Sequence, residues 1–187
     1  MPPGALPPSP PSPIRQISTP EGIEIHGPAR YRDIDGAVIS ESVELRLFPS
    51  DGPLIGPPLA KATNAPIRLA PSTGPMSVRL VAYRGRRASH ASAAFMLSWT
   101  APPTAPSPIG FIDDNGRTQL MWPALEDDVK SVTVLRDGSP IAELEPKRTS
   151  FSEPAPGPRH QYQLVIRGET FCSAPSAPVV LTRSPNP

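Results

Sequence analysis

The sequence predicts an all-β chain built from two small β-sandwich domains. The chain has 30 prolines and 13 glycines among its 187 residues, and proline interrupts helices and pushes the preceding residue toward extended conformations. Between the prolines, apolar and polar residues alternate in short runs, as half-buried strands do. The two halves of the chain also resemble each other, which indicates one module used twice.

Length and charge restrict the possible partners. A length of 187 residues suits two compact modules of roughly 80 to 90 residues each. The 18 basic and 17 acidic side chains give a net charge of +1, which is too balanced for a general electrostatic grip on nucleic acid or an anionic membrane. We therefore expect no nucleic acid and no membrane as partners. With Cys172 as the only cysteine, no intramolecular disulfide stabilises the domains.

Residues 1–20 predict an extended proline-rich arm. They contain Pro-Pro pairs and Ser-Pro steps with little apolar bulk, a composition that favours polyproline II and forms no core. The stretch lacks the basic and apolar regions of a signal peptide, so export by that route is not expected. We expect the arm to act as a tether that docks onto a neighbouring subunit.

A second proline-rich stretch, residues 101–108, has the composition of a short, semi-rigid linker. It separates a first sandwich, residues 21–100, from a second one, residues 109–184. Three segments match between the halves in the same order, roughly 83 to 86 residues apart. The matched pairs are 43–55 with 131–141, 77–85 with 161–168, and 92–98 with 176–182.

The first matched pair predicts a hairpin in each domain. In both halves an alternating run leads to an Asp-Gly step, at Asp51-Gly52 and at Asp137-Gly138, followed by proline and aliphatic residues. Asp-Gly between two alternating runs favours a strand, a tight turn and a second strand.

The second half, residues 105–183, resembles a fibronectin type III domain. The resemblance rests on an alternating strand that ends in Trp122 and Pro123, and on the later Tyr-x-Leu-x-Ile strand that begins at Tyr162. It implies that Trp122 is the core tryptophan of the second strand. It also implies that Tyr162 occupies the tyrosine corner, whose hydroxyl caps a loop.

The first half resembles the same family less closely, and a divergent immunoglobulin-like sandwich is the alternative. It has no Trp-Pro pair after its second strand, which we expect within residues 29–39, and Trp99 stands at the end of its last strand instead. The implied fold class is two tandem immunoglobulin-like sandwiches of fibronectin type III type, preceded by the proline-rich arm.

No pattern in the sequence predicts a catalytic, cofactor or metal site, and we expect the chain not to be an enzyme. The three histidines and Cys172 do not stand in metal-ligand spacing. The chain also lacks a Gly-x-Ser-x-Gly elbow. Residues 113–116, Asp-Asp-Asn-Gly, offer oxygen ligands without the spacing of an EF-hand loop. A turn with Gly116 at positive φ is the favoured interpretation.

A basic turn between the last two strands of the first domain is the strongest candidate for partner binding. Its residues are Tyr83, Arg84, Arg86, Arg87 and His90. Loops at the ends of sandwiches are frequent contact points, and arginine binds carboxylates, acidic glycans and phosphates. A solvated hairpin loop without a partner is the alternative.

These features together predict a non-catalytic structural or adhesion protein. Fibronectin type III modules without a signal peptide, in an Ala-, Arg- and Pro-rich composition, resemble accessory domains of tailed-phage virions. The resemblance implies location in the virion, as a tail, baseplate, fibre or capsid-decoration component. Its partners would be other virion proteins, a second copy of the chain and a host surface glycan. The alternative is a bacterial surface or secreted module that binds polysaccharide or a partner protein.

Overall fold

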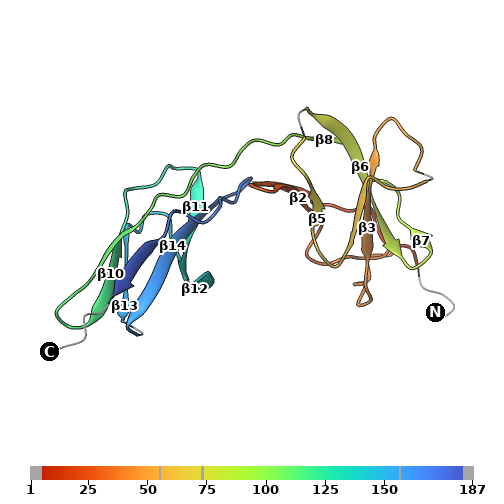
Figure 1. The fold of residues 1–187 in the computed structure, drawn as a ribbon. Helices are drawn as coiled ribbons and strands as arrows, with labels where there is room; N and C mark the ends of the chain where they lie inside the picture. The colour runs from red at the N-terminus through yellow and green to blue at the C-terminus, as the bar shows by residue number, and fades with distance from the viewer. Residues whose placement is uncertain (1–5, 55, 73, 156, 183–187) are drawn as a thin grey trace. The chain divides into compact units, whose positions relative to one another are not determined.

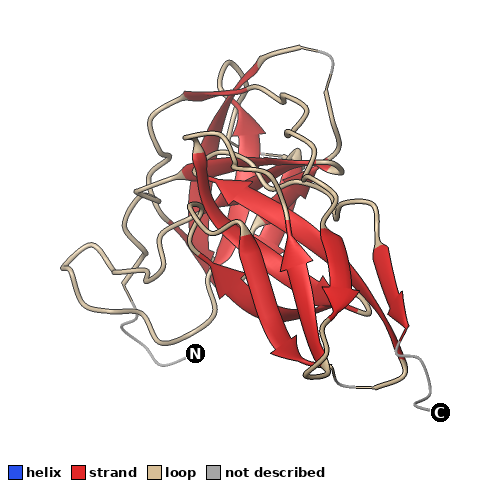
Figure 2. Ribbon diagram, turned by 90° about the vertical axis from the view of Figure 1, so that its left-hand side faces the viewer, coloured by secondary structure: helices blue, strands red, loops and turns tan. Residues whose placement is uncertain are grey.

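The fold is all-β, as the sequence predicts. A computed structural model describes residues 6–54, 56–72, 74–155 and 157–182, and these residues form strands and loops without a helix (Figure 2). Within that range there is accordingly no helix that could cross a membrane. The chain divides into two compact units, Met1–Thr100 and Ala101–Pro187. Residues 1–5 of the expected arm, Ile55 of the first matched segment, and residues 183–184 lie outside the described residues.

The described part of the first unit contains eight strands in two sheets (Figure 1). One sheet has the order β1–β2–β5. The other has the order β4–β3–β6, with β7 and β8 both paired to β6. The strands are β1 (Arg15–Thr19), β2 (Gly22–His26), β3 (Glu44–Pro49), β4 (Ala60–Thr63), β5 (Ile67–Leu69), β6 (Met76–Arg84), β7 (Arg87–Ala88) and β8 (Phe95–Leu97).

The described part of the second unit contains seven strands in the same arrangement. Its sheets have the orders β13–β10–β9 and β12–β11–β14–β15. The strands are β9 (Ile109–Ile112), β10 (Arg117–Met121), β11 (Val129–Arg136), β12 (Ser139–Leu144), β13 (Ser150–Pro154), β14 (Arg159–Gly168) and β15 (Val179–Thr182). In both units the first, second and fifth strands form one sheet, and the remaining strands form the other. The expectation of two tandem immunoglobulin-like sandwiches is confirmed.

Each unit has its own hydrophobic core, formed by the inward-facing residues of its two sheets. In the first unit the core includes Ile23, Ile25, Leu45, Leu47, Ile67 and Leu80. In the second it includes Leu120, Trp122, Val132, Val134, Tyr162 and Leu164. These residues recur at every second position of their strands, which is the period that brings side chains to one face of a sheet.

Trp122 and Tyr162 both anchor the core of the second unit. The indole Nε1–H of Trp122 donates a hydrogen bond to the carbonyl of Arg148 at 2.9 Å. Tyr162 is fully buried, and its hydroxyl donates to the carboxylate of Glu153 at 2.8 Å. The expected loop-capping bond therefore differs here: the acceptor is a side chain of β13 that Arg136 also holds, at 2.9 Å. Burial raises the pKa of Tyr162, so the phenol stays a donor.

In each unit, two serines form hydrogen bonds with residues of the sixth strand, β6 or β14, in place of a paired neighbouring strand. In the second unit the Oγ of Ser176 accepts from the amide of Leu164 at 3.0 Å, while the amide of Ser176 donates to the carbonyl of Leu164 at 2.8 Å. Ser173 makes the same two bonds with Ile166. We call each such serine a serine staple. It satisfies both polar groups of a buried strand residue with a single residue.

The first unit repeats these staples at equivalent positions. The Oγ of Ser92 accepts from the amide of Leu80, and the Oγ of Ser89 accepts from the amide of Ala82. Each staple of the second unit lies 84 positions after its counterpart in the first. The sequence match of 77–85 with 161–168 is therefore wrong by one position at its end, because it pairs Arg84 with Arg167 whereas the staples pair Arg84 with Gly168.

Two strand assignments in the first unit are wrong. The second strand is Gly22–His26, not a segment within 29–39, because a tight reversal after β1 brings β2 back beside it, with Gly22 at φ 137°. The Asp51-Gly52 step also forms no tight hairpin. A loop containing three prolines separates β3 from β4, since prolines lack the amide that pairing with β3 requires.

The Asp-Gly hairpin of the second unit and the turn at residues 113–116 are confirmed. Asp137 and Gly138 adopt φ values of 51° and 79° between β11 and β12, which are typical of a type I′ turn. Gly116 has a φ of 70°, and the carboxylate of Asp113 accepts from the amides of Asn115 and Arg117. That carboxylate is therefore a turn-forming group.

The proline-rich arm is shorter than expected. Residues 15–19 of the expected arm form β1, which pairs with β2 along its whole length. Ile14 packs against the core of the first unit. Residues 6–13, which we call the amino-terminal segment, contact their own unit as described below. Because prolines dominate the residues before Ile14, the short alternating strand after it is not evident from the sequence.

Removing one staple should destabilise one unit. Ser176→Ala leaves the amide of Leu164 buried without an acceptor, and we expect a loss of about 1–3 kcal/mol in the free energy of unfolding. Ser92→Ala should cost the first unit a similar amount. Urea unfolding of each unit, followed by NMR, measures both changes. Ser107→Ala, at an exposed serine, is the control, and a loss equal to the control's would contradict the role of the staples.

Trp122→Ala should cost the second unit about 3–5 kcal/mol, because it removes a large buried ring and leaves a cavity. Met121 is the neighbouring residue and is 47% exposed, so Met121→Ala should change stability by less than about 0.5 kcal/mol. Thermal unfolding of both variants tests the placement of the ring. Equal melting temperatures for the two variants would show that Trp122 is not a core residue.

Candidate functional site

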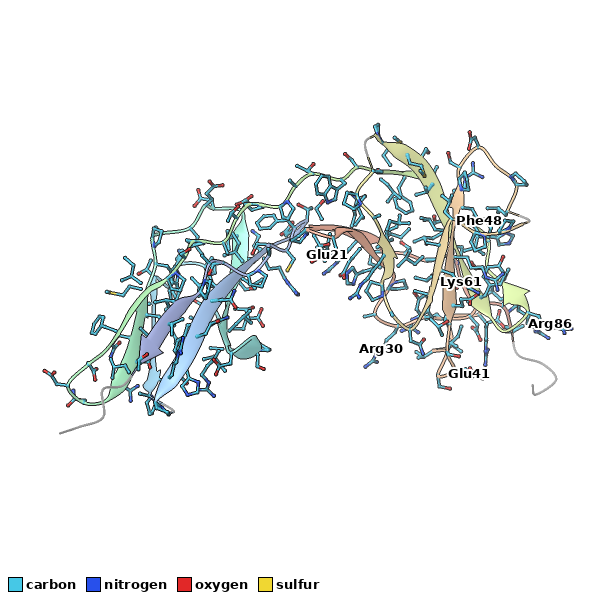
Figure 3. The ribbon with its side chains drawn as sticks, in the orientation of Figure 1. Glu21, Arg30, Glu41, Phe48, Lys61 and Arg86 are labelled. Atoms are coloured by element: carbon cyan, nitrogen blue, oxygen red, sulfur yellow. The ribbon has the colours of Figure 1, made fainter. Side chains whose placement is uncertain are left out.

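The candidate site is one end of the first unit, where three of its loops meet. The loops are residues 27–43 between β2 and β3, residues 64–66 between β4 and β5, and the turn between β6 and β7. Strand pairing places them together, because Glu44 at the start of β3 pairs with both Thr63 and Tyr83. We call this the loop end. Figure 3 shows Arg30, Glu41 and Arg86 toward it, with Glu21 and Phe48 toward the opposite end.

Two of the five residues expected in the binding loop have structural roles. The Arg84 guanidinium forms an ion pair with the carboxylate of Glu41, and its side chain is only 15% exposed. Tyr83 lies within β6 rather than in the turn, and the guanidinium of Arg46 stacks over its ring at 4.0 Å. This cation–π contact holds Tyr83 on the outer face of the sheet.

The other three expected residues are exposed. Arg86 lies in the turn, Arg87 opens β7 and His90 follows it, and all three side chains face solvent. Gly85 supports the turn with a φ of 61°, a conformation that side chains other than glycine's rarely adopt. The Arg84–Glu41 pair ties the base of the turn to the loop 27–43. The structure therefore presents Arg86 and Arg87 on a braced turn.

Tyr31 is a residue of the loop end that the sequence does not single out. It lines two open hollows of about 420 and 430 Å³, one beside Glu41 and Asn64 and the other beside the amino-terminal segment. Burial raises the pKa of Tyr31 to about 12, so its phenol is neutral at physiological pH. Gly27 makes room for it, since a Cβ there would lie 2.3 Å from the Tyr31 hydroxyl oxygen.

The loop end combines apolar and basic side chains. Ile34 and Val38 are 55% and 52% exposed on the loop 27–43, and Arg30 and Arg32 of the same loop face solvent. Arginine beside exposed apolar groups is typical of protein–protein interfaces. No group of three or more metal-ligating side chains occurs within the residues that the structure describes. The chemistry offered here is recognition of an acidic and partly apolar surface.

Several solved structures of tandem fibronectin modules are similar to this chain. No known family and no curated protein matches the sequence. Among solved structures, the chain is similar to domains FN1–FN3 of chicken CNTN1, with 14% identity and a TM-score of 0.45 over 96% of this chain and 69% of that one. It is also similar to the fibronectin(III)-like modules of Clostridium thermocellum CbhA, with 17% identity and a TM-score of 0.42 over 91% and 90%. A two-domain fibronectin type III segment of chicken tenascin matches with 15% identity and a TM-score of 0.37 over 92% and 99%.

The brace between Arg84 and Glu41 should weaken in acid. The hydrogen bond from Arg84 lowers the pKa of Glu41 below its usual value of 4.5. Because the folded pKa is the lower one, the contribution of this pair to stability is complete above pH 4.5 and is lost as the pH falls through the folded value. An NMR titration of the Arg84 side chain should show this change in the wild type and not in Glu41→Gln. The same acid transition in both proteins would contradict the assignment.

Proposed function

We propose that this chain is a non-catalytic module that contacts a protein partner through the loop end of its first unit. The observation that carries the proposal is the turn with exposed Arg86 and Arg87, which the Arg84–Glu41 ion pair ties to the loop 27–43, a loop that carries the exposed apolar residues Ile34 and Val38. Sandwiches of this architecture position loops on a rigid scaffold, and binding residues gather on such loops. The partner that fits is a protein surface with carboxylates around an apolar patch.

We further propose that the chain is a structural or adhesion component of a tailed-phage virion. The duplicated sandwich, the proline- and arginine-rich composition and the single cysteine support this assignment, which rests on analogy of fold and composition. In a virion the loop end would contact other virion proteins, and the amino-terminal segment would dock onto a neighbouring subunit. A bacterial surface or secreted module that binds polysaccharide is the competing function.

Immunogold labelling distinguishes the two functions. An antibody against the chain is applied to purified particles induced from the bacterium that carries the gene, and to washed, uninduced cells of the same strain. We expect label on the particles at a fixed position. Label confined to the surface of uninduced cells would contradict the virion assignment and support the surface module.

Particle incorporation tests the loop end itself. A tagged chain with Arg86→Ala and Arg87→Ala, supplied during assembly, should enter particles at least about tenfold less than the tagged wild type, since truncated hot-spot arginines cost more than about 1 kcal/mol each. The matched control is Arg159→Ala with Arg167→Ala, because both of these arginines are exposed in the second unit. Equal incorporation of the two double variants would refute a specific role for the turn.

A further inference from the structure

The amino-terminal segment pairs with a loop of the first unit as a short added strand. Pro8 lies opposite Asp33 in an antiparallel bridge. The amide of Ser9 donates to the carbonyl of Arg32 at 2.7 Å, and the hydroxyl of Ser9 donates to the carbonyl of Asp33, also at 2.7 Å. On the other side of the bridge, the amide of Ile34 donates to the segment's carbonyl at position 7, at 3.2 Å. The edge at residues 32–34 thus receives an extended peptide.

This edge is formed by bonds that do not involve the segment. The carboxylate of Asp33 accepts from the amides of Asp35 at 3.1 Å and Ala37 at 2.9 Å. The guanidinium of Arg32 donates to the carbonyl of Gly36 at 2.7 Å. These bonds close the loop on itself, so the edge keeps its shape when the segment leaves. A preformed edge binds an extended peptide at a lower entropic cost than a disordered one.

The contacts that hold the amino-terminal segment allow it to detach from the edge and bind again. Its polar contacts with the edge are to backbone atoms, and a further one is the long contact of 3.5 Å from the Arg84 guanidinium to the carbonyl of Leu6. Pro8 and Pro11 are its buried side chains, and prolines keep the free segment extended. Ile14, which packs on the core, and strand β1 follow the segment and are not part of it. The segment can therefore detach without breaking the sheet.

We infer that the edge at residues 32–34 is an acceptor for the amino-terminal segment of a second copy of this chain. Exchange between two copies keeps every contact described above and changes only which chain supplies the segment, as in domain swapping. The inference deepens the docking role proposed for the segment and rests on it for the choice of partner. The donor is residues 6–13 of one copy, and the acceptor is the edge at residues 32–34 of the other.

Because the segment is covalently attached to the unit that carries its own acceptor, exchange between copies depends on the protein concentration. A short tether gives the segment an effective concentration on the order of millimolar at its own acceptor. Exchange in solution is therefore expected only as the protein approaches that concentration. Copies held side by side in an assembly would reach it locally.

Disulfide trapping between full-length chains tests the exchange. Both variants carry Cys172→Ala to remove the native thiol; one adds Pro7→Cys and the other Ile34→Cys. Positions 7 and 34 flank the Pro8–Asp33 bridge and face each other, at the roughly 4.5–5.5 Å Cα separation of antiparallel partners, which a disulfide can span. The two variants are mixed at roughly 1 mM, oxidised and separated without reductant.

We expect a covalent dimer that contains one chain of each kind. The matched control replaces Pro7→Cys with Pro10→Cys, at an exposed position outside the paired stretch, and should give mixed dimer only at the level of random collision. A single chain that carries both Pro7→Cys and Ile34→Cys should close its own disulfide at low concentration.

Two results would overturn the inference. One is closure of the doubly substituted chain with no excess of mixed dimer over the control, since the segment would then pair only within its own chain. The other is failure of the doubly substituted chain to close, because the edge would not bind the segment at all. Neither result bears on the labelling of particles, so failure of the exchange and failure of the proposed function are distinguishable.

Discussion

The whole structure depends on satisfying backbone hydrogen bonds in a chain where 30 of 187 residues are prolines. A proline lacks the amide that a sheet needs, yet both cores are enclosed by paired strands. The serine staples satisfy buried backbone groups where the strand beside β6 or β14 is interrupted. Each staple gives a buried residue both an acceptor and a donor, so these buried amides stay paired whether the interruption contains a proline, as at Pro175 in the second unit, or none, as between Ser89 and Ser92 in the first. Since the staples recur 84 positions apart, they also show that the two units share one hydrogen-bonding scheme.

The two units keep this scheme but differ in the outer faces of their three-stranded sheets. In the first unit that face carries Glu24, whose carboxylate contacts Arg68 at 2.9 Å and His26 at 3.2 Å. In the second unit the corresponding sheet exposes Ile109, Phe111 and Met121, and Ile109 lies directly opposite Met121. A duplicated scaffold has thus been given a charged, ion-paired face in one copy and an apolar face in the other.

The sequence predicts the second unit better than the first, for physical reasons. Around Asp137-Gly138 and Trp122 the local signals agree with the tertiary contacts, so turn and core are found by inspection. In the first unit, residues 29–39, where we expect the second strand, form a loop, and the true second strand is Gly22–His26. Its place depends on pairing with β1 and β5, which no local pattern reveals. The same holds for the candidate site. In the sequence Arg84 is one of several basic residues of the turn, and only the fold brings Glu41, 43 positions earlier, against it.

The staples have a further consequence for behaviour in a crowded environment. A sheet edge is a template for aggregation when it offers a long row of free amides and carbonyls. Here that edge is divided into pieces, with β7 two residues long, β8 three and β15 four, and the serines between them direct their polar groups inward. Neighbouring molecules therefore find no continuous edge to extend along this side. This side of each four- or five-stranded sheet is therefore protected against edge-to-edge pairing between molecules.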